Sequence, residues 1–213
     1  ARLAVQSLGE VVPLKQPPEG EEDAARGESV EEYVTRRTKE FNVETRERPF
    51  DINAWLQFAA FQDVILKLST KRADEKQLAE KKIAIYERAL SYHKGSETLL
   101  LAMLEESKRV EDPEALEREW RRVLRHHGGC AQLWRAYLAK QASQFTGFSM
   151  SAMRRTYAEA LQALGVERVR RQQSHAPPEL VEEMYHAQLD LVVDLCQLEM
   201  HSGHTEMMVA RVQ

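Results

Sequence analysis

The amino-acid sequence predicts an all-α fold, an α-solenoid of antiparallel helical hairpins. Three observations lead to this prediction. Glycine and proline are scarce, at 9 and 7 in 213 residues, and after Pro49 they separate segments of helical length. Apolar residues in these segments recur at spacings of three and four, which is the pattern of one helix face. The helices themselves recur about every 35 residues, a period typical of stacked helical hairpins.

The first thirty residues have a different composition from the rest. They contain three of the seven prolines, three of the nine glycines and an acidic run from Glu19 to Asp23. Apolar residues also recur between Leu3 and Leu14. Residues 1–29 are therefore predicted to be an extended linker or a partner-docking segment. Residues 30–213 are predicted to form the helical repeat domain.

Capping residues predict where the helices begin and end. Helix starts are marked by residues whose side chains can accept hydrogen bonds from the first helical turn: Asp51 or Asn53, Ser96, Asp112 before Pro113, and Ser149. Helix ends are expected at Gly95, Gly128 and Gly165, where glycine permits a left-handed cap. The stretch from Gly165 to Pro178 is expected to be a long insert between the third hairpin and the last helices.

Two series of helices alternate along the chain. The first helix of each hairpin carries two apolar residues three positions apart: Trp55 with Phe58, Leu99 with Ala102, and Trp134 with Tyr137. The second helix is centred on an aromatic residue: Tyr86, Trp120 and Tyr157. These aromatic residues are expected to pack in the core between antiparallel helices. About three and a half repeats are predicted, and the last is expected to be truncated at the C-terminus.

These repeats resemble the half-a-tetratricopeptide (HAT) repeat, a TPR-like unit found in RNA-processing scaffolds. A longer stretch around the first hairpin resembles the start of the HAT region in the nuclear-RNAi-defective-2 (NRDE-2) family. The stretch comprises Thr38–Asn42, Arg46–Asp51, Trp55–Phe58 and Phe61–Asp63, and the resemblance is strongest over residues 33–164.

The resemblance implies a nuclear protein, in the nucleoplasm and nuclear speckles, that works with the exosome-associated RNA helicase and with splicing and silencing factors. In that family the helicase-docking segment lies upstream of the repeats, so it is expected outside this chain. The residues of the stretch also have clear structural roles. Phe41 is expected to pack beneath the first hairpin, Pro49 to stop the preceding helix, Asp51 to cap the next one and Trp55 to fill its seam.

No pattern in the sequence predicts an enzyme or a cofactor. Cys130 and Cys196 have no neighbouring histidine and no CxxC partner. His201 and His204 are spaced as a helical metal pair, but Gly203 lies between them. Phosphate-binding glycine loops and the HExxH and GxSxG motifs are missing from the sequence.

The net charge of −4 is not typical of a dedicated nucleic-acid-binding domain. Two arginine clusters nevertheless stand out as candidate partner-binding residues. One places four arginines on a single helix face: Arg118, Arg121, Arg122 and Arg125. The other lies in the expected insert: Arg168, Arg170 and Arg171. Each is either a solvated helix face paired with nearby glutamates, or a site for an acidic peptide or RNA phosphate.

The leading hypothesis is a non-catalytic protein-interaction scaffold in nuclear RNA processing, surveillance or silencing. The alternatives are a weak RNA-binding repeat module that uses the arginine clusters, and a helical-repeat subunit that supports an enzyme. The longest apolar run, Leu99–Leu104, is too short for a membrane span. The chain begins with alanine and ends without a helix terminator, so we expect a fragment of a longer protein. Its open apolar face is expected at Met207, Met208 and Val212.

Overall fold

The computed structural model describes residues 29–68, 75–143 and 149–202. This part of the chain contains eight α-helices and no strand, which confirms the predicted all-α fold. The helices group into two compact units, residues 1–93 and 94–213, and each is described by itself. The predicted linker lies outside the described residues except for Ser29.

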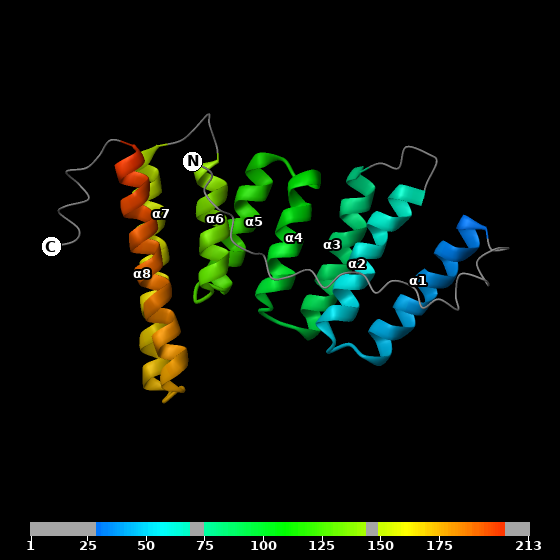
Figure 1. The fold of residues 1–213 in the computed structure, drawn as a ribbon, viewed down its shortest axis with the longest axis horizontal. Helices are drawn as coiled ribbons and strands as arrows, with labels where there is room; N and C mark the ends of the chain where they lie inside the picture. The colour runs from blue at the N-terminus through cyan, green and yellow to red at the C-terminus, as the bar shows by residue number, and fades with distance from the viewer. Residues whose placement is uncertain (1–28, 69–74, 144–148, 203–213) are drawn as a thin grey trace. The chain divides into compact units, whose positions relative to one another are not determined.

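The first unit consists of α1 (Val30–Glu47), α2 (Ile52–Leu68) and α3 (Glu75–Tyr92) (Figure 1). α1 packs against α2, and α2 pairs with α3. α1 begins at a reciprocal cap, in which the backbone N–H of Glu32 donates to the Ser29 hydroxyl at 3.2 Å and the Ser29 N–H donates to the Glu32 carboxylate at 2.9 Å. α2 begins directly after Asp51, whose carboxylate accepts from the Asn53 N–H at 3.0 Å.

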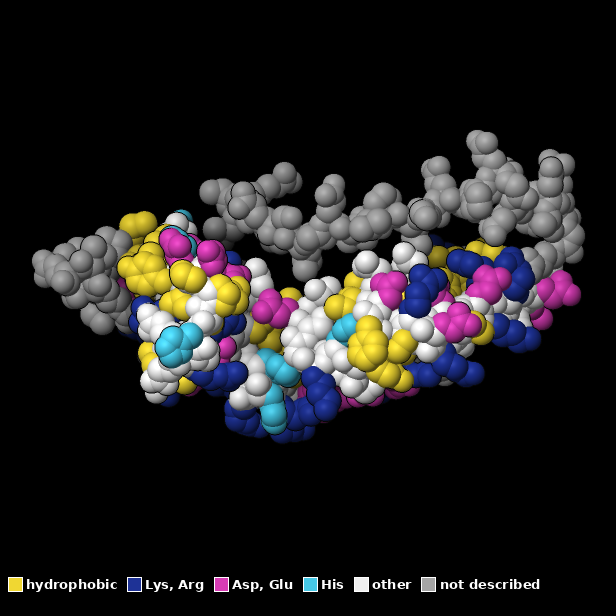
Figure 2. All heavy atoms as spheres, turned by 90° about the horizontal axis from the view of Figure 1, so that it is seen from below, with side chains coloured by type: hydrophobic (Ala, Val, Ile, Leu, Met, Phe, Trp, Pro, Cys, Tyr) yellow, Lys and Arg dark blue, Asp and Glu magenta, His cyan; other side chains and the backbone are white. Residues whose placement is uncertain are grey.

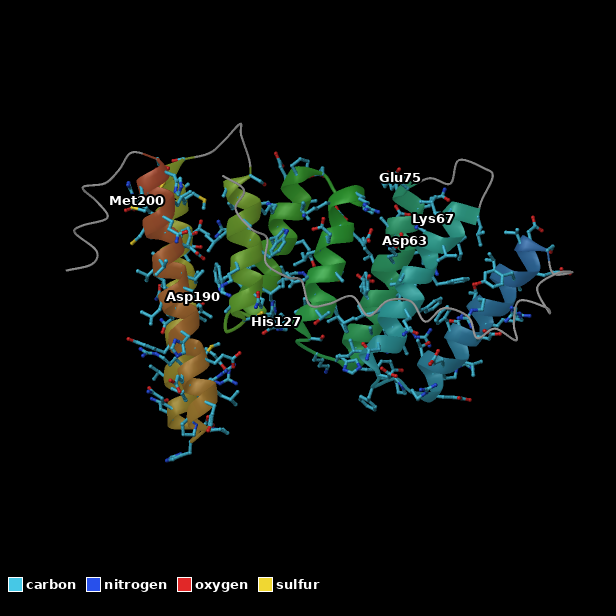
Figure 3. All side chains as sticks on the ribbon, in the orientation of Figure 1. Asp63, Lys67, Glu75, His127, Asp190 and Met200 are labelled. Carbon is cyan, nitrogen blue, oxygen red and sulfur yellow. The ribbon has the colours of Figure 1, made fainter. Side chains whose placement is uncertain are left out.

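Aromatic side chains form the core of the first unit. The ring of Phe41, on α1, stacks on Phe58 with centroids 5.5 Å apart and lies 5.2 Å from Phe61. Trp55 is completely buried. Lys82 is also buried, but its ammonium lies 2.7 Å from the Asp63 carboxylate, which compensates for the loss of hydration (Figure 3 labels Asp63). α1 is therefore held to the α2–α3 pair mainly by ring packing.

The second unit consists of five helices: α4 (Glu97–Val110), α5 (Pro113–His126), α6 (Ala131–Ala142), α7 (Met150–Gln173) and α8 (Pro178–His201). Successive helices run antiparallel, as Figure 1 shows. Its core contains completely buried side chains from four of these helices: Leu99, Leu104, Leu133, Tyr137, Leu164 and Leu191. Tyr86 of the first unit and Trp120 and Tyr157 of the second are buried in their respective cores.

Several predicted helix ends are confirmed. The Ala115 N–H donates to the Asp112 carboxylate at 2.7 Å, with Pro113 as the first helical residue, and the Ala152 N–H donates to the Ser149 hydroxyl at 3.4 Å. Ser96 occupies the cap position of α4, but its side chain makes no capping hydrogen bond. Gly95 has a φ of +88°, a conformation that favours glycine.

The prediction that Gly165 ends a helix is wrong. α7 runs without interruption through Gly165 to Gln173. A Cβ atom at Gly165 would lie 3.2 Å from the Gln188 amide nitrogen, which donates to the Leu161 carbonyl at 3.0 Å. Glycine costs about 1 kcal/mol inside a helix, and here it permits the close approach of α8. The residues expected to form the insert therefore comprise the last turns of α7, a short connection and the start of α8.

Two helices, one in each unit, are joined to the preceding turn by the same hydrogen bond. The Trp55 indole N–H donates to the Pro49 carbonyl at 2.9 Å. The Trp134 indole N–H donates to the Gly128 carbonyl at 2.9 Å. In both cases the acceptor precedes the tryptophan by six residues. The predicted correspondence between Trp55 and Trp134 is thus accompanied by the same local geometry.

Candidate partner-binding surface

The first arginine cluster lies on the exposed side of α5. Its four members, Arg118, Arg121, Arg122 and Arg125, are called the basic ridge. The opposite side of α5 is buried through Leu116, Trp120, Val123 and Leu124. This separation follows from the helical spacing, because arginines at i, i+3, i+4 and i+7 share one face. The local structure of α5 is therefore as the sequence predicts.

Three of the four ridge arginines are paired with carboxylates. Arg121 lies 3.3 Å from Glu117 and 2.8 Å from Glu159 of α7. Arg122 lies 2.5 Å from Glu119, and Arg118 makes a longer contact of 4.0 Å with Glu114. Arg125 is exposed and makes no ion pair within the described part of the chain.

Arg121 belongs to a polar network that joins α5 to α6. The carboxylate of Glu117 accepts hydrogen bonds from the hydroxyl of Tyr137, from the Lys140 ammonium at 2.7 Å and from the Gln141 amide at 3.1 Å. Burial alone raises the pKa of Glu117, but the bonds from Lys140 and Tyr137 outweigh it and lower the pKa. Burial and then Glu117 raise the pKa of Tyr137 to about 12. These interactions stabilise the helix pair.

Replacing Glu117 by glutamine is expected to lower the free energy of unfolding by about 1–2 kcal/mol at pH 7, because hydrogen bonds to a charged acceptor are lost. The pKa of Glu117 is lower in the folded state, so its contribution is present above an unfolded-state pKa near 4.3 and is lost as the pH falls through the folded-state value. The difference between wild type and Glu117→Gln should therefore shrink between pH 7 and pH 3 in urea titrations. An equal difference at both pH values would contradict this assignment.

The pairing pattern predicts unequal effects of charge reversal along the ridge. Arg121→Glu is expected to destabilise the second unit by about 1–2 kcal/mol, because it places a third carboxylate beside Glu117 and Glu159. Arg125→Glu, its matched control, should change stability by less than about 0.5 kcal/mol. Thermal unfolding by circular dichroism compares the two, and an equal loss would show that Arg125 also has a structural partner.

The end of α5 lies on the face shown in Figure 2, where lysine or arginine side chains gather beside histidines. His127, labelled in Figure 3, caps the helix. Burial and then the neighbouring charge of His126 lower the pKa of His127.

Cys130 caps the start of α6, and its sulfur accepts a hydrogen bond from the Leu133 N–H at 3.4 Å. Burial raises the pKa of Cys130 to about 12, so the thiol stays protonated at neutral pH and is a poor nucleophile.

The second arginine cluster belongs to α7 and not to a loop. Arg170 and Arg171 lie 3.4 and 3.1 Å from Glu167. Arg168 has a different environment, with its guanidinium carbon 5.8 Å from the centroid of the Tyr185 ring on α8. Arg170 and Arg171 thus share Glu167, whereas the ion pairs of the basic ridge are made with Glu114, Glu117, Glu119 and Glu159. The two clusters are therefore separate surfaces of the second unit.

Sequence reasoning missed an exposed apolar face on α8. We call it the α8 stripe: Tyr185, Leu189, Val193 and Met200, which are 43–52% exposed. Figure 3 labels Met200 near the end of the helix. The spacing of four between the first three members is the signal that could have found it. The apolar face expected at Met207, Met208 and Val212 lies outside the described residues.

A second missed surface is an aromatic layer on the first unit. The ring of Phe50 is 74% exposed and lies edge-on to Tyr92, with centroids 6.0 Å apart. Tyr92 in turn stacks on Trp55 at 6.1 Å, and the guanidinium of Arg88 lies 5.7 Å from the centre of the Trp55 ring. Phe50 falls within the sequence stretch that carries the family resemblance, yet its ring contributes little to the core.

Comparison with known proteins identifies the family. Residues 36–213 match the family described as "NRDE-2, necessary for RNA interference". The chain belongs to the NRDE-2 family. It is 32% identical over 188 residues to the mouse protein named nuclear exosome regulator NRDE2, and 31% identical over 210 residues to the human protein of that name. A protein of the same name from Dictyostelium discoideum is 22% identical over 149 residues.

This NRDE-2 family chain is short relative to those proteins. The matches cover 83%, 92% and 66% of the chain but only 16%, 18% and 11% of the mouse, human and Dictyostelium proteins. The family match also extends through the second unit, beyond the range 33–164 that carries the sequence resemblance most strongly. Among the described helices, none is both long and apolar enough to cross a membrane. In the same ranges, no three His, Cys, Asp or Glu side chains gather as a metal site.

Proposed function

We propose that this chain is part of a non-catalytic interaction scaffold, an α-solenoid of HAT-type repeats, in a nuclear protein that regulates the RNA exosome. The mouse and human relatives are named nuclear exosome regulators, which supports the nuclear and exosome assignments. The exosome-associated RNA helicase is the partner that the family resemblance implies. In this proposal residues 30–213 form the repeat domain, and a segment outside this chain docks the helicase.

The repeat architecture has support in both units. Antiparallel helix pairs follow one another, and their aromatic residues recur at corresponding positions. The identical bonds from Trp55 to Pro49 and from Trp134 to Gly128 are expected if the two helices are copies of one structural unit. These features also support the proposal that the helices within each unit are arranged as hairpin repeats.

The observation that carries the scaffold proposal is the α8 stripe. Its four apolar side chains span 16 residues of one helix face, and the 15 steps between the first and the last give a length of about 22 Å at 1.5 Å per residue. Exposed apolar side chains that share one helix face are typical of interaction sites, because a closed domain gains stability by burying them. A surface that binds another helical element is therefore more consistent with the structure than a self-contained catalytic domain.

Direct RNA binding through the basic ridge has weaker support. Phosphate groups would have to compete with the carboxylates that already pair with Arg118, Arg121 and Arg122. Arg125 is the one ridge arginine without an ion pair among the described residues. Binding of RNA to the ridge would therefore release few counterions from the phosphates, so it would contribute little affinity at physiological salt. These pairings favour a protein partner as the main ligand of the scaffold.

The test is immunoprecipitation of the full-length protein from nuclear extract, with and without ribonuclease. We expect the exosome-associated helicase to co-purify after ribonuclease treatment, as measured by quantitative mass spectrometry. Replacing Leu189 and Val193 by glutamate should deplete other protein partners, whereas Arg125→Glu, the exposed charge control, should not. Recovery that depends on intact RNA would favour the RNA-binding alternative. Recovery of no RNA-processing protein by soluble, folded protein would contradict the scaffold.

A further inference from the structure

The α7–α8 hairpin carries a groove where the two helices meet their connection. The groove has a volume of about 480 Å³ and is lined by Arg168, Ala176, Pro178, Val181, Glu182 and Tyr185. All of these residues belong to the second unit. Its size falls within the range of about 300–1,000 Å³ typical of sites for small ligands and short segments. Figure 1 shows the connection between α7 and α8, next to which these residues lie in the sequence, at the lower end of the hairpin.

Arg168 lines this groove with a guanidinium that makes no ion pair among the described residues. Its Nε atom is shielded from solvent and has no hydrogen-bond partner among the described residues. The guanidinium makes no ion pair with a described carboxylate, although Glu182 lines the same groove. Arg170 and Arg171, its neighbours on α7, both pair with Glu167. Because the Arg168 charge is not already paired with a described carboxylate, an incoming carboxylate would gain more here than at either neighbour.

The rest of the groove suits an apolar side chain. Ala176, Pro178 and Val181 supply aliphatic surface, and the ring of Tyr185 is 48% exposed. The ring is held by the Arg168 guanidinium and by the edge of His186, with ring centroids 6.2 Å apart. Because the ring is already ordered, contact with it costs little additional entropy. A ligand that combines a carboxylate with an aliphatic group matches both halves of the groove.

The charges around the groove favour a peptide over a nucleic acid. Arg168 is its one unpaired cation among the described residues, whereas single-stranded RNA needs a row of cations along its phosphates. Glu179 and Glu183 are exposed at the same end of α8 and would repel a phosphate backbone. A single carboxylate carries one negative charge and is repelled by them less than a chain of phosphates is. We propose that the groove binds a short peptide segment that carries an aspartate or glutamate close to a leucine, isoleucine, valine or proline.

This inference rests on the scaffold function, because it names one class of partner for the second unit. The test uses the full 213-residue chain and an array of capped hexapeptides that contain glutamate within three residues of leucine or proline, each with a glutamine counterpart. We expect a subset to bind in fluorescence polarisation, and their glutamine counterparts to bind at least tenfold more weakly, as expected for a charge-assisted pair.

Variants of the chain separate the groove from general charge effects. Arg168→Gln should weaken binding at least tenfold, whereas Arg170→Gln, the same change two residues away, should alter it less than twofold. Glu182→Gln should strengthen binding, because it removes a competing carboxylate from the groove. Ala176→Phe should block binding without removing Arg168, which covers the case in which Arg168→Gln fails to fold by circular dichroism.

Three results would overturn the inference. The first is that no acidic peptide binds. The second is that Arg168→Gln and Arg170→Gln weaken peptide binding equally. The third is that the chain binds an oligouridine RNA but no peptide, and that Arg168→Gln abolishes the RNA binding. If the helicase still co-purifies with the full-length protein in any of these cases, the groove assignment fails and the scaffold function stands.

Discussion

Replacing Trp134 by alanine is expected to lower the free energy of unfolding of the second unit by about 3–5 kcal/mol. The side chain is 5% exposed, so its removal leaves a cavity that the surrounding helices cannot close completely. The change also removes the donor to the Gly128 carbonyl at the turn before α6. Both losses act at the point where the α5–α6 connection is attached to the core.

Hydrogen–deuterium exchange on the whole chain measures this effect unit by unit. Amides of α6 and α7 should lose protection in Trp134→Ala, and amides of α2 in the first unit should serve as the internal reference. Trp134→Phe is the matched control, since it keeps most of the volume and loses the hydrogen bond, and it should cost about 1–2 kcal/mol. A loss below about 1 kcal/mol in Trp134→Ala would contradict a core role for this residue.

Replacing Arg154 by methionine is expected to cost about 3–5 kcal/mol, the usual effect of removing one member of a buried ion pair. The Nε atom of Arg154, on α7, lies 2.8 Å from the carboxylate of Glu199 on α8, and Glu199 is completely buried. The methionine fills similar space but leaves the carboxylate without its guanidinium. The loss should therefore come from electrostatics rather than from packing.

A double variant tests that explanation. Arg154→Met combined with Glu199→Leu should recover most of the lost stability, because an apolar pair of similar volume needs no charge compensation. Arg122→Met is the surface control. It removes the ion pair between the exposed Arg122 side chain and Glu119, and it should cost less than about 1 kcal/mol. Urea unfolding of the four proteins decides the matter, and failure of the double variant to recover would show that the cost lies in packing.

Local sequence signals predicted the helical fold well. Asp112 with Pro113, Ser149 and Gly95 mark helix ends because their effects depend on the neighbouring backbone alone. Gly165 shows the limit of such signals. Its intrinsic preference favours a helix end, but contact with Gln188 on another helix makes glycine suitable inside α7. Tertiary packing overrode the local preference at this position.

The candidate site could be predicted only in part. The spacing of the ridge arginines placed them on one face of α5, but it could not show that Arg121 pairs with Glu159, which is 38 residues away. The same limit applies to Arg168, whose neighbours Arg170 and Arg171 have identical charge and a different environment. Side chains distant in sequence decide which arginine is available to a partner.

The sequence by itself determined the helices and the residues that resemble the NRDE-2 family, and it predicts an approximate repeat. Helix periodicity, capping and motif spacing are all properties of nearby residues. Only the tertiary structure decided that α7 continues through Gly165, that the α8 stripe is exposed and that Arg168 lines a groove beside Tyr185. Exposure and pairing depend on which helices pack together, and contacts between residues far apart in the chain determine that packing.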